Sequence, residues 1–424
     1  MSKTNRRDFL MTSAVAAGAL AAELAFSSGV HAAGNDVIKV GLVGCGGRGK
    51  GAIRNCLQAD PNLKLVALGD AFEDRAKDAL DGLKKDGYGN KMDVGDRVFI
   101  GLKAYQQVIA QSDLVLLATP PGFRPTHIAA VVAAKKHLFT EKPVAVDGPG
   151  IRTVLEAYKA ANDAKLCVVA GTQRRHQTGY LESMKRIHGG DIGEILAARC
   201  YWNQGGLWVR KRDKSMTDLE WQVRNWLYFT WLSGDHIVEQ HVHNLDVINW
   251  ALQDHPLKAR GMGGRQVRTG PEYGNIFDHF AIEYEYPKNI HLLSTCRQID
   301  GTVGDVSEWL VGTKGRWGTP GHNYELTGPN PWKVKTKGYD NEPYNQEHTD
   351  LVKHIREGKQ INELENVANS TLTAIMGRMA AYTGQEVTWE AALNSKEVLM
   401  PQDLSFDMTL PVPEVAVPGK TKLI

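Results

Sequence analysis

A glycine-rich turn near the start of the chain constrains its fold more than any other segment. Residues 37–43 form an apolar, β-branched run, which breaks into the sequence GCGGRG at residues 44–49. Residues 52–59 then have the pattern of a helix. This order of strand, glycine turn and helix is the arrangement that places a dinucleotide pyrophosphate at a helix N-terminus. The segment therefore predicts a nucleotide-binding unit rather than an ordinary glycine turn.

The residues of this turn have distinct expected roles. Gly44 permits the tight turn, Gly46 lets the backbone approach the phosphates, and Gly49 lets helix and strand pack closely. Gly47 and Arg48 lie between them and are expected to line the same site.

A carboxylate follows the second predicted strand, residues 63–68. This residue, Asp70, lies about 20 residues after the last glycine, where a carboxylate can hold the ribose hydroxyls of adenosine. No Arg or Lys follows Asp70 directly, so we expect NAD as the cofactor. Arg48 and Arg75 leave NADP as the less favoured alternative.

The N-terminus, residues 1–33, is predicted to be an export signal. Arg6 and Arg7 precede a weakly apolar run at residues 11–25, and small residues near position 32 supply a cleavage site. The run is short and interrupted by Glu23, so we expect no stable membrane anchor. Twin-arginine signals are export addresses, which makes the twin-arginine machinery an expected partner and the periplasm or exterior the expected location.

Composition favours a two-domain protein without a nucleic-acid partner. The 424 residues carry a net charge of +2, with no strongly basic surface to bind nucleic acid. The five cysteines show no metal or redox spacing, so buried free thiols are expected. We assign residues 34–173 to a first domain, 174–400 to a second domain, and 401–424 to an extended C-terminal tail.

The two domains differ in their predicted secondary structure. Strands and helices alternate over residues 34–173, which predicts a doubly wound parallel sheet of the Rossmann type. After Gln173, long strand-like runs that alternate in polarity predict an α/β domain with a large, mainly antiparallel open sheet. These runs are residues 195–202, 257–266, 277–286, 290–297 and 306–312. One amphipathic helix is predicted at residues 236–252, and further helices at 348–357 and 368–382.

Lys142 is the first candidate catalytic residue. It follows a predicted strand directly, within Glu141-Lys142-Pro143, and open α/β sheets place ligands at such carboxyl ends. An ammonium group there can donate a hydrogen bond to a substrate hydroxyl or to the alkoxide that forms from it. The alternative is a surface lysine in a turn.

A cluster of acidic and histidine side chains spans residues 235–246. If the segment is one helix, Glu239 and His243 share a face. A carboxylate beside an imidazole fixes its tautomer and raises its basicity, which suits removal of a hydroxyl proton. Asp246 could orient the same ring or bind substrate. The alternative is a polar helix face.

The same cluster raises the question of a metal site. His236, Glu239 and His243 fall on neighbouring turns, and two imidazoles with a carboxylate could bind zinc or iron. However, the pair His241 and His243 would converge only from a strand, whereas the segment has a helical pattern. We therefore expect no metal.

Tryptophans and arginines are concentrated before this cluster. Aromatic faces and guanidinium groups suit a carbohydrate pocket, for which Arg174 and Trp208 are candidates. A subunit interface is the alternative, because it is enriched in the same residues. The tryptophans are Trp202, Trp208, Trp221, Trp226 and Trp231, and the arginines are Arg174, Arg175, Arg210, Arg212 and Arg224.

With the glycine turn, the Glu-Lys-Pro triplet and the Glu239/His243 pair in this order, the chain resembles the Gfo/Idh/MocA oxidoreductase family over residues 36–400. Later markers are the sequences VGTKG at 311–315 and TGQEVTW at 383–389. The resemblance implies a Rossmann domain, a second domain whose open sheet mediates dimers or tetramers, and NAD(P)-linked redox chemistry on a sugar, cyclitol or glycoside. It gives acid/base roles to Lys142 and to the Glu239/His243 pair, and places Thr119, Pro120, Glu141 and Gln173 beside the nicotinamide.

The chain departs from the family pattern at three places. Glu239 replaces the usual Asp, His241 stands where Gly is common, and the loop at residues 121–125 is longer than usual. His241 is therefore a second candidate base beside His243.

Export has a consequence for the cofactor. Free NAD is scarce outside the cytoplasm, so we expect NAD to be loaded before export and to stay bound. A bound cofactor also suits a redox-neutral glycosidase or lyase that oxidises its substrate transiently. A sugar-binding protein without catalysis is a further alternative.

Overall fold

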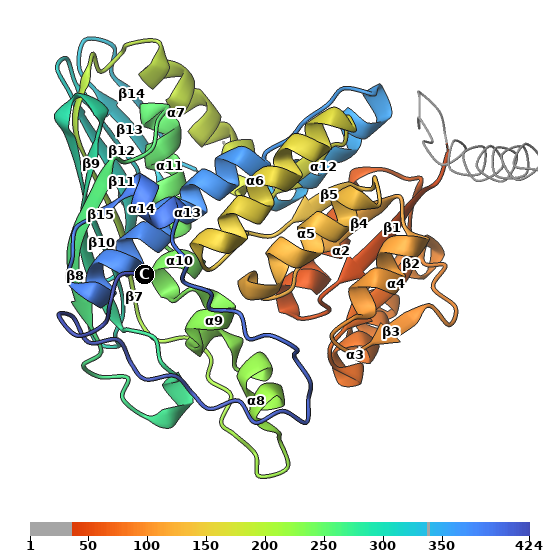
Figure 1. Ribbon diagram of the computed structural model, residues 1–424. Coiled ribbons are helices and arrows are strands. Elements are labelled where there is room, and N and C mark those ends of the chain that lie inside the picture. Colours follow the sequence, from red (N-terminus) through yellow and green to blue (C-terminus); the bar gives the residue numbers. More distant parts are fainter. Residues whose placement is uncertain (1–35, 337–339) are drawn as a thin grey trace, which may run out of the picture.

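The computed structural model describes residues 36–336 and 340–424, so the predicted export signal lies outside the described part of the chain. The described residues form a smaller parallel sheet and a larger open sheet, with helices between and around them (Figure 1).

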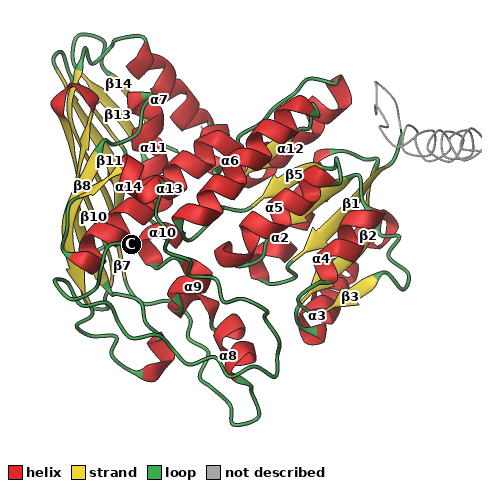
Figure 2. Ribbon diagram, viewed as in Figure 1, coloured by secondary structure: helices red, strands yellow, loops and turns green. Residues whose placement is uncertain are grey.

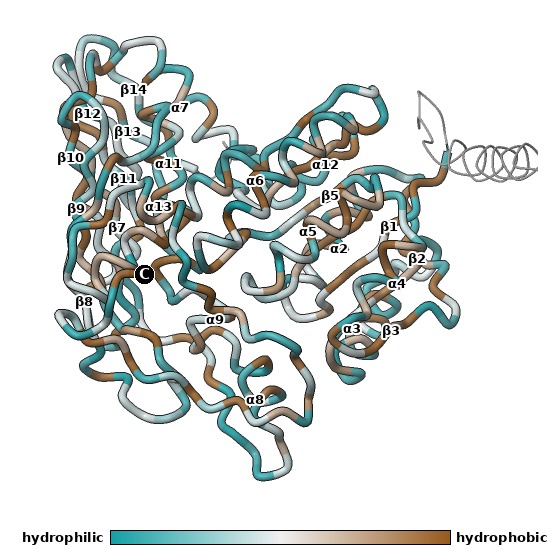
Figure 3. Tube along the Cα trace, viewed as in Figure 1, coloured by the Kyte–Doolittle hydropathy of each residue, from teal (hydrophilic) through white to brown (hydrophobic). Residues whose placement is uncertain are grey.

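The N-terminal sheet has six parallel strands in the order β3-β2-β1-β4-β5-β6. Its central strands are short apolar runs that are buried on both faces, as parallel sheets covered by helices require. Figure 3 shows the hydrophobic residues of β1. The prediction of a doubly wound sheet is confirmed. The strands are β1 (Ile38–Val43), β2 (Leu63–Asp70), β3 (Val98–Ile100), β4 (Leu114–Leu117), β5 (His137–Thr140) and β6 (Val168–Ala170), and the helices are α2 (Gly47–Ala59), α3 (Glu73–Lys85), α4 (Ala104–Gln111), α5 (Arg124–Ala133) and α6 (Gly148–Asp163).

A C-terminal segment completes this first unit. Helix α12 (Pro343–Glu357) packs on α2, and its residues Leu351 and Ile355 belong to the same hydrophobic cluster as strand β1. The backbone N–H of Val168 donates to the carbonyl of Ile361 at 2.7 Å, beside β6. Helix α12 therefore packs on the first unit, although it lies within residues 174–400, which the sequence analysis assigned to the second domain. A single boundary at residue 173 cannot describe a later helix, α12, that packs on the hydrophobic core of the first unit.

The second sheet has nine strands in the order β14-β13-β12-β11-β7-β10-β9-β8-β15. Within the described residues, the pairing of β7 with β10 is parallel and the other pairings are antiparallel. This confirms a mainly antiparallel sheet, and Figure 2 shows helices over one of its faces. The strands are β7 (Ile195–Gln204), β8 (Lys258–Gly264), β9 (His279–Tyr286), β10 (Ile290–Gln298), β11 (Asp305–Gly312), β12 (Arg316–Gly318), β13 (Tyr324–Thr327), β14 (Trp332–Val334) and β15 (Val387–Thr388).

The prediction of one helix at residues 236–252 is wrong in one respect, because the structure has two shorter helices there. One helix ends at Glu239 and the next begins at Val242. At the break, the side chain of Gln240 accepts a hydrogen bond from Gln204 at 3.2 Å, and His241 contacts Ser294 at 2.7 Å. These contacts with the large sheet hold the turn. The helices of this part are α7 (Thr178–His188), α8 (Asp218–Arg224), α9 (Thr230–Ser233), α10 (His236–Glu239), α11 (Val242–Leu252), α13 (Leu364–Thr383) and α14 (Trp389–Leu393).

Residues 401–424 contain no helix or strand. Leu404, Phe406 and Leu410 pack on a hydrophobic cluster that contains residues of both domains, and the N–H of Gly419 donates to the carbonyl of Thr383 at 2.9 Å. In the part of the chain that the structure describes, no helix has the length and apolar character to cross a membrane. The cysteines are free and buried, as predicted.

Candidate active site

A cleft of about 590 Å³ lies between the carboxyl ends of the parallel strands and the second domain. Its Rossmann side is formed by the glycine turn and the residues that follow β2, β4 and β5. Its other side comes from α10, α11 and the segment around α8. The predicted site residues in its lining are Gly44, Gly46, Gly47, Arg48, Asp70, Thr119, Pro120, Glu141, Lys142, Gln173, Trp208, Glu239 and His243.

The glycine turn has the shape that a pyrophosphate needs. Gly44 has φ +91°, and a Cβ on Gly49 would lie 1.8 Å from the carbonyl oxygen of Gly44. In contrast, a Cβ on Gly46 or Gly47 would meet no atom within 4 Å, so these residues face open space. Helix α2, which has 13 residues, begins at Gly47. The lack of a side chain at Gly49 therefore lets α2 pack closely against the turn, and Gly46 and Gly47 leave room for phosphate.

Asp70 is held with its carboxylate in the cleft. Its two oxygens accept hydrogen bonds from the backbone N–H groups of Cys45, at 2.6 Å, and Phe72, at 2.9 Å. Burial raises the pKa of the Asp70 carboxyl, and the two backbone N–H groups oppose this effect. The carboxylate is thus fixed where ribose hydroxyls can donate to it. The donor and acceptor set fits the adenosine half of NAD.

Arg48 joins the glycine turn to residues that the sequence analysis missed. Its guanidinium pairs with Glu141 and, at 3.1 Å, with Glu347, and it lies 4.9 Å from the ring centre of Tyr344. Glu347 and Tyr344 lie on α12, and Tyr344 also lines the cleft. No local pattern signals a contact across such a distance in the chain.

Lys142 contacts Glu239 rather than lying free on the surface. Its ammonium donates to the carbonyl oxygen of Glu239 at 2.5 Å and to Oε1 at 3.2 Å. This places the carboxylate of Glu239 beside Lys142. An ammonium has three donors, so Lys142 can hold Glu239 and still bind a substrate oxygen.

His243 is 8% exposed and lines the cleft, with its ring stacked 5.8 Å from that of Trp202. Burial holds its pKa well below the usual range, and the positive charges of Lys142 and other nearby cations lower it further. The predicted rise in basicity through Glu239 is therefore wrong, because burial and positive charge dominate. The imidazole is therefore neutral at pH 7, the form with a free ring nitrogen that can accept a proton, and its lowered pKa makes it a weaker base than an unperturbed histidine.

The structure does not bring three predicted substrate residues to the cleft. His241 is fully buried, contacts Ser294, and has a pKa lowered to about 3 by burial and by Arg174. Of the two candidate bases, His243 is the one in the cleft lining. Arg174 pairs instead with the buried Glu308.

Asp246 is likewise in a structural contact. It pairs with Arg175 at 2.9 Å and accepts a hydrogen bond from Ser370 at 2.7 Å. A sequence pattern marks such residues as polar but does not reveal a buried partner. Among the described residues, no three His, Cys, Asp or Glu side chains are grouped so as to hold a metal ion.

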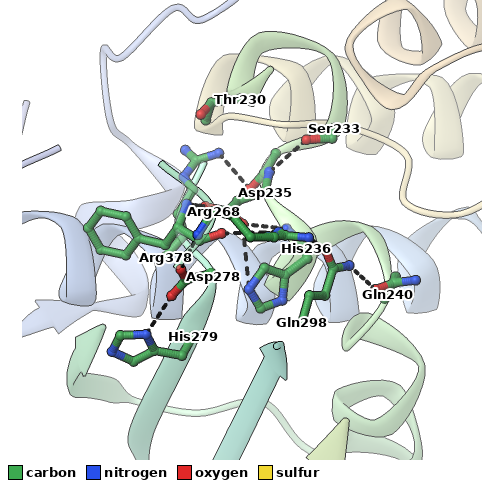
Figure 4. A network of polar contacts seen from close by, with 12 residues as sticks. Thr230, Ser233, Asp235, His236, Gln240, Arg268, Asp278, His279, Gln298 and Arg378 are labelled. Carbon is green, nitrogen blue, oxygen red and sulfur yellow. Dashed lines mark hydrogen bonds and ion pairs between the residues drawn. The ribbon is translucent and has the colours of Figure 1, made fainter. Parts of the chain in front are cut away.

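A buried polar network fixes the start of α10, and with it the position of Glu239 (Figure 4). Asp235 has φ +76° and accepts hydrogen bonds from the hydroxyl of Tyr382 at 2.6 Å and the N–H of Phe277 at 2.8 Å. The N–H of His236 donates to the same carboxyl group at 2.5 Å. A non-glycine residue with a positive φ persists where its surroundings hold it in place.

The tryptophan cluster divides into two groups. Trp221 and Trp231 are buried in a hydrophobic cluster. Trp208 is 44% exposed, lies 6.1 Å from Trp226, and lines the cleft together with it. An exposed aromatic face at the cleft can pack against the C–H face of a sugar.

A family comparison identifies the first unit. Residues 38–172 match the sequence model of the Gfo/Idh/MocA family, described as "Oxidoreductase family, NAD-binding Rossmann fold". The first unit is therefore similar to this family over about a third of the chain. The match spans the six-stranded sheet, the glycine turn and Asp70.

Two curated relatives match part of the chain. An inositol 2-dehydrogenase of Klebsiella pneumoniae is 30% identical over 223 residues, which are 51% of this chain and 55% of that protein. A 2,7-anhydro-N-acetylneuraminate hydratase of Escherichia coli is 29% identical over 175 residues, 41% of this chain and 43% of that protein. The chain spans about half the length of the curated relatives it matches.

Solved structures extend the likeness in fold to both domains. The scyllo-inositol dehydrogenase of Lactobacillus casei has a TM-score of 0.63 at 19% identity and covers 84% of this chain and 99% of its own. A levoglucosan dehydrogenase solved with NADH and levoglucosan has a TM-score of 0.65 at 16% identity, with coverage of 83% and 99%. These comparisons show the shared two-domain fold.

Proposed function

We propose that this protein is an NAD-dependent oxidoreductase that oxidises a hydroxyl group of a sugar, cyclitol or glycoside. The observation that carries the proposal is that Lys142 and His243 line the same cleft as the glycine turn and Asp70. The relative named inositol 2-dehydrogenase supports a polyhydroxylated substrate.

The chain's own residues divide the work as follows. Gly46 and Gly47 hold the pyrophosphate, and Asp70 holds the ribose hydroxyls. Bound NAD supplies the hydride acceptor. Lys142 donates a hydrogen bond to the substrate oxygen, and the neutral imidazole of His243 accepts the hydroxyl proton. Glu239 positions the ammonium of Lys142.

The proposal is tested by NADH formation with a panel of inositols, aldoses and glycosides. We expect activity with at least one of them, and Lys142→Ala should reduce it by about 10²-fold or more. If no member of the panel yields NADH with either the native protein or Lys142→Ala, the protein is a sugar-binding protein that retains the fold. Activity that is present and unchanged in Lys142→Ala would exclude Lys142 as a catalytic residue.

We further propose that NAD remains bound through many turnovers and that the protein works after twin-arginine export. The support is the export signal predicted at residues 1–33. A mass spectrum under native conditions should contain the cofactor mass. Protein that carries no nicotinamide and turns over only with excess soluble NAD would contradict this.

A redox-neutral reaction is the second candidate. The relative named as a hydratase supports it, because hydration causes no net oxidation. In that case aryl glycosides would release phenol without accumulation of NADH. Net NADH formation in proportion to product would favour the first candidate.

Self-association through the large sheet is a separate proposal. Met262 on β8 and Leu293 on β10 alternate along their strands with more buried residues and are 74% and 50% exposed, so they lie on the sheet face that the helices leave uncovered. Apolar side chains on an open sheet face favour a partner surface. We expect a dimer or tetramer by light scattering, and Leu293→Lys should shift it towards the monomer.

A further inference from the structure

The adenosine end of the cleft is covered by residues from the second domain. Asp70 marks this end, and Phe72 follows it at the N-terminus of α3. Opposite Phe72, the cleft lining contains Arg224, which ends α8. The two sides are in direct contact.

Arg224 makes this contact in two ways. Its guanidinium carbon lies 3.9 Å from the ring centre of Phe72. Its two terminal nitrogens donate to the carboxylate oxygens of Asp74, at 3.0 and 2.9 Å, in a bidentate pair. One residue of the second domain thus contacts the segment directly after the ribose-binding carboxylate.

The C-terminal tail supports the same contact from outside. The ring of Phe406 lies 5.7 Å from that of Phe72. The tail is tied to α8, because Leu410 donates to Asp218 at 3.0 Å and accepts a hydrogen bond from Gln222 at 2.7 Å. Phe72, α8 and the tail belong to one hydrophobic cluster. We call Phe72, Asp74, Arg224 and Phe406 the clasp.

We propose that Phe72 and Arg224 form the outer wall of the adenosine subsite, and that the nicotinamide dinucleotide enters and leaves only when the clasp opens. The inference rests on the proposed NAD-dependent function and explains how the chain retains the cofactor. It makes Arg224 and Phe406 positioning residues for cofactor binding, although neither lies in the glycine turn.

The clasp can be loosened without unfolding the protein. The side chain of Asp74 is 60% exposed, and exposed ion pairs contribute little to stability. Loss of the pair should therefore change the rate of opening more than the stability of the fold. Phe406 does not line the cleft, so its effect on binding must act through Phe72 and the tail.

The test uses the full chain and NADH as the probe. Stopped-flow fluorescence measures NADH association and its displacement by excess NAD for the native protein, Asp74→Asn, Arg224→Ala and Phe406→Ala. We expect Asp74→Asn and Phe406→Ala each to raise both rate constants by about tenfold, with a smaller change in Kd. Lys333→Ala is the matched control, because it removes an exposed ion pair with Glu325 that lies between β13 and β14.

The possible outcomes separate this inference from the proposed function. If NADH binds but both Asp74→Asn and Phe406→Ala exchange it at the native rate, the clasp is not a gate. If Arg224→Ala weakens binding while the other two variants are silent, Arg224 is a direct ligand and the gate is again excluded. If the native protein neither carries a bound nicotinamide dinucleotide nor binds NADH, the proposed function itself fails.

Discussion

The two sides of the cleft are built in different ways. The Rossmann side consists of backbone at consecutive strand ends, where Gly44, Gly46 and Asp70 take their positions from β1, α2 and β2. The other side consists of side chains whose positions depend on distant parts of the chain, such as His243 against Trp202. The Rossmann side can therefore be predicted from a short sequence motif. The opposite side depends on contacts that form only when distant segments have folded together. The following predictions test this difference.

The largest effect is expected in the glycine turn. Gly49→Ala places a Cβ against the carbonyl of Gly44, a rigid backbone atom, and should destabilise the fold by about 3 kcal/mol. Gly46→Ala meets no protein atom, so it should keep the native melting temperature and lose NADH affinity. Calorimetry and NADH titration of both variants separate these effects. Equal melting temperatures would mean that the turn is less rigid than described.

The two histidines provide a matched pair on the opposite side. His243→Leu should lower kcat by about 10³-fold with little change in stability, because the ring lines the cleft. His241→Leu should lose its contact with Ser294 and cost about 1–3 kcal/mol of stability. Steady-state kinetics and thermal unfolding are the measurements. The reverse outcome would make His241 the base.

The pH dependence of stability should report on the contacts of His176, which lies at the start of the second domain and reaches α12. His176 contacts Asp350 on α12 at 2.7 Å and Glu363 at 3.2 Å; although burial opposes the charge, these carboxylates raise its pKa to about 10. Because folding raises this pKa, protonated His176 stabilises the native state fully below the unfolded value of 6.5. This stabilisation is lost as pH rises through about 10. The free energy of unfolding of the native protein should therefore fall by on the order of a few kcal/mol between these two pH values.

His176→Gln is the comparison for that measurement. It should be less stable near neutral pH and should lack this alkaline loss in urea unfolding. Parallel curves for the two proteins would show that His176 is neutral in the folded state.

The smallest effect is expected at the exposed wall of the cleft. Trp208→Ala should raise the KM for the sugar about tenfold, leave kcat nearly constant, and leave NADH affinity unchanged. Trp208 is 44% exposed, so the melting temperature should not move. A loss of NADH affinity instead would place Trp208 on the cofactor side.

The sequence predicted the parallel sheet and the cofactor side because their signals are local. Apolar runs followed by glycine or by a charged residue mark β1, β2 and β5 directly. Strands β12 to β15 were missed because segments of two to four residues carry no readable period. The break in the helix at Gln240 was also missed, since its cause is a contact with Gln204.

The substrate side was predicted less well for the same reason. Arg174 and Asp246 have the residue types of a sugar site, but Glu308 and Arg175 pair with them inside the fold. Tyr344 and Glu347 reach the glycine turn from α12, which no motif marks. A pattern gives the chemistry of a side chain but not its partner.

The return of α12 to the first core has a consequence for how the protein is made. Until Leu351 and Ile355 leave the ribosome, the apolar surface of α2 and β1 lacks its cover. The nucleotide-binding half therefore matures only after most of the polypeptide has been synthesised, and a fragment cut after residue 173 should aggregate rather than bind a nucleotide.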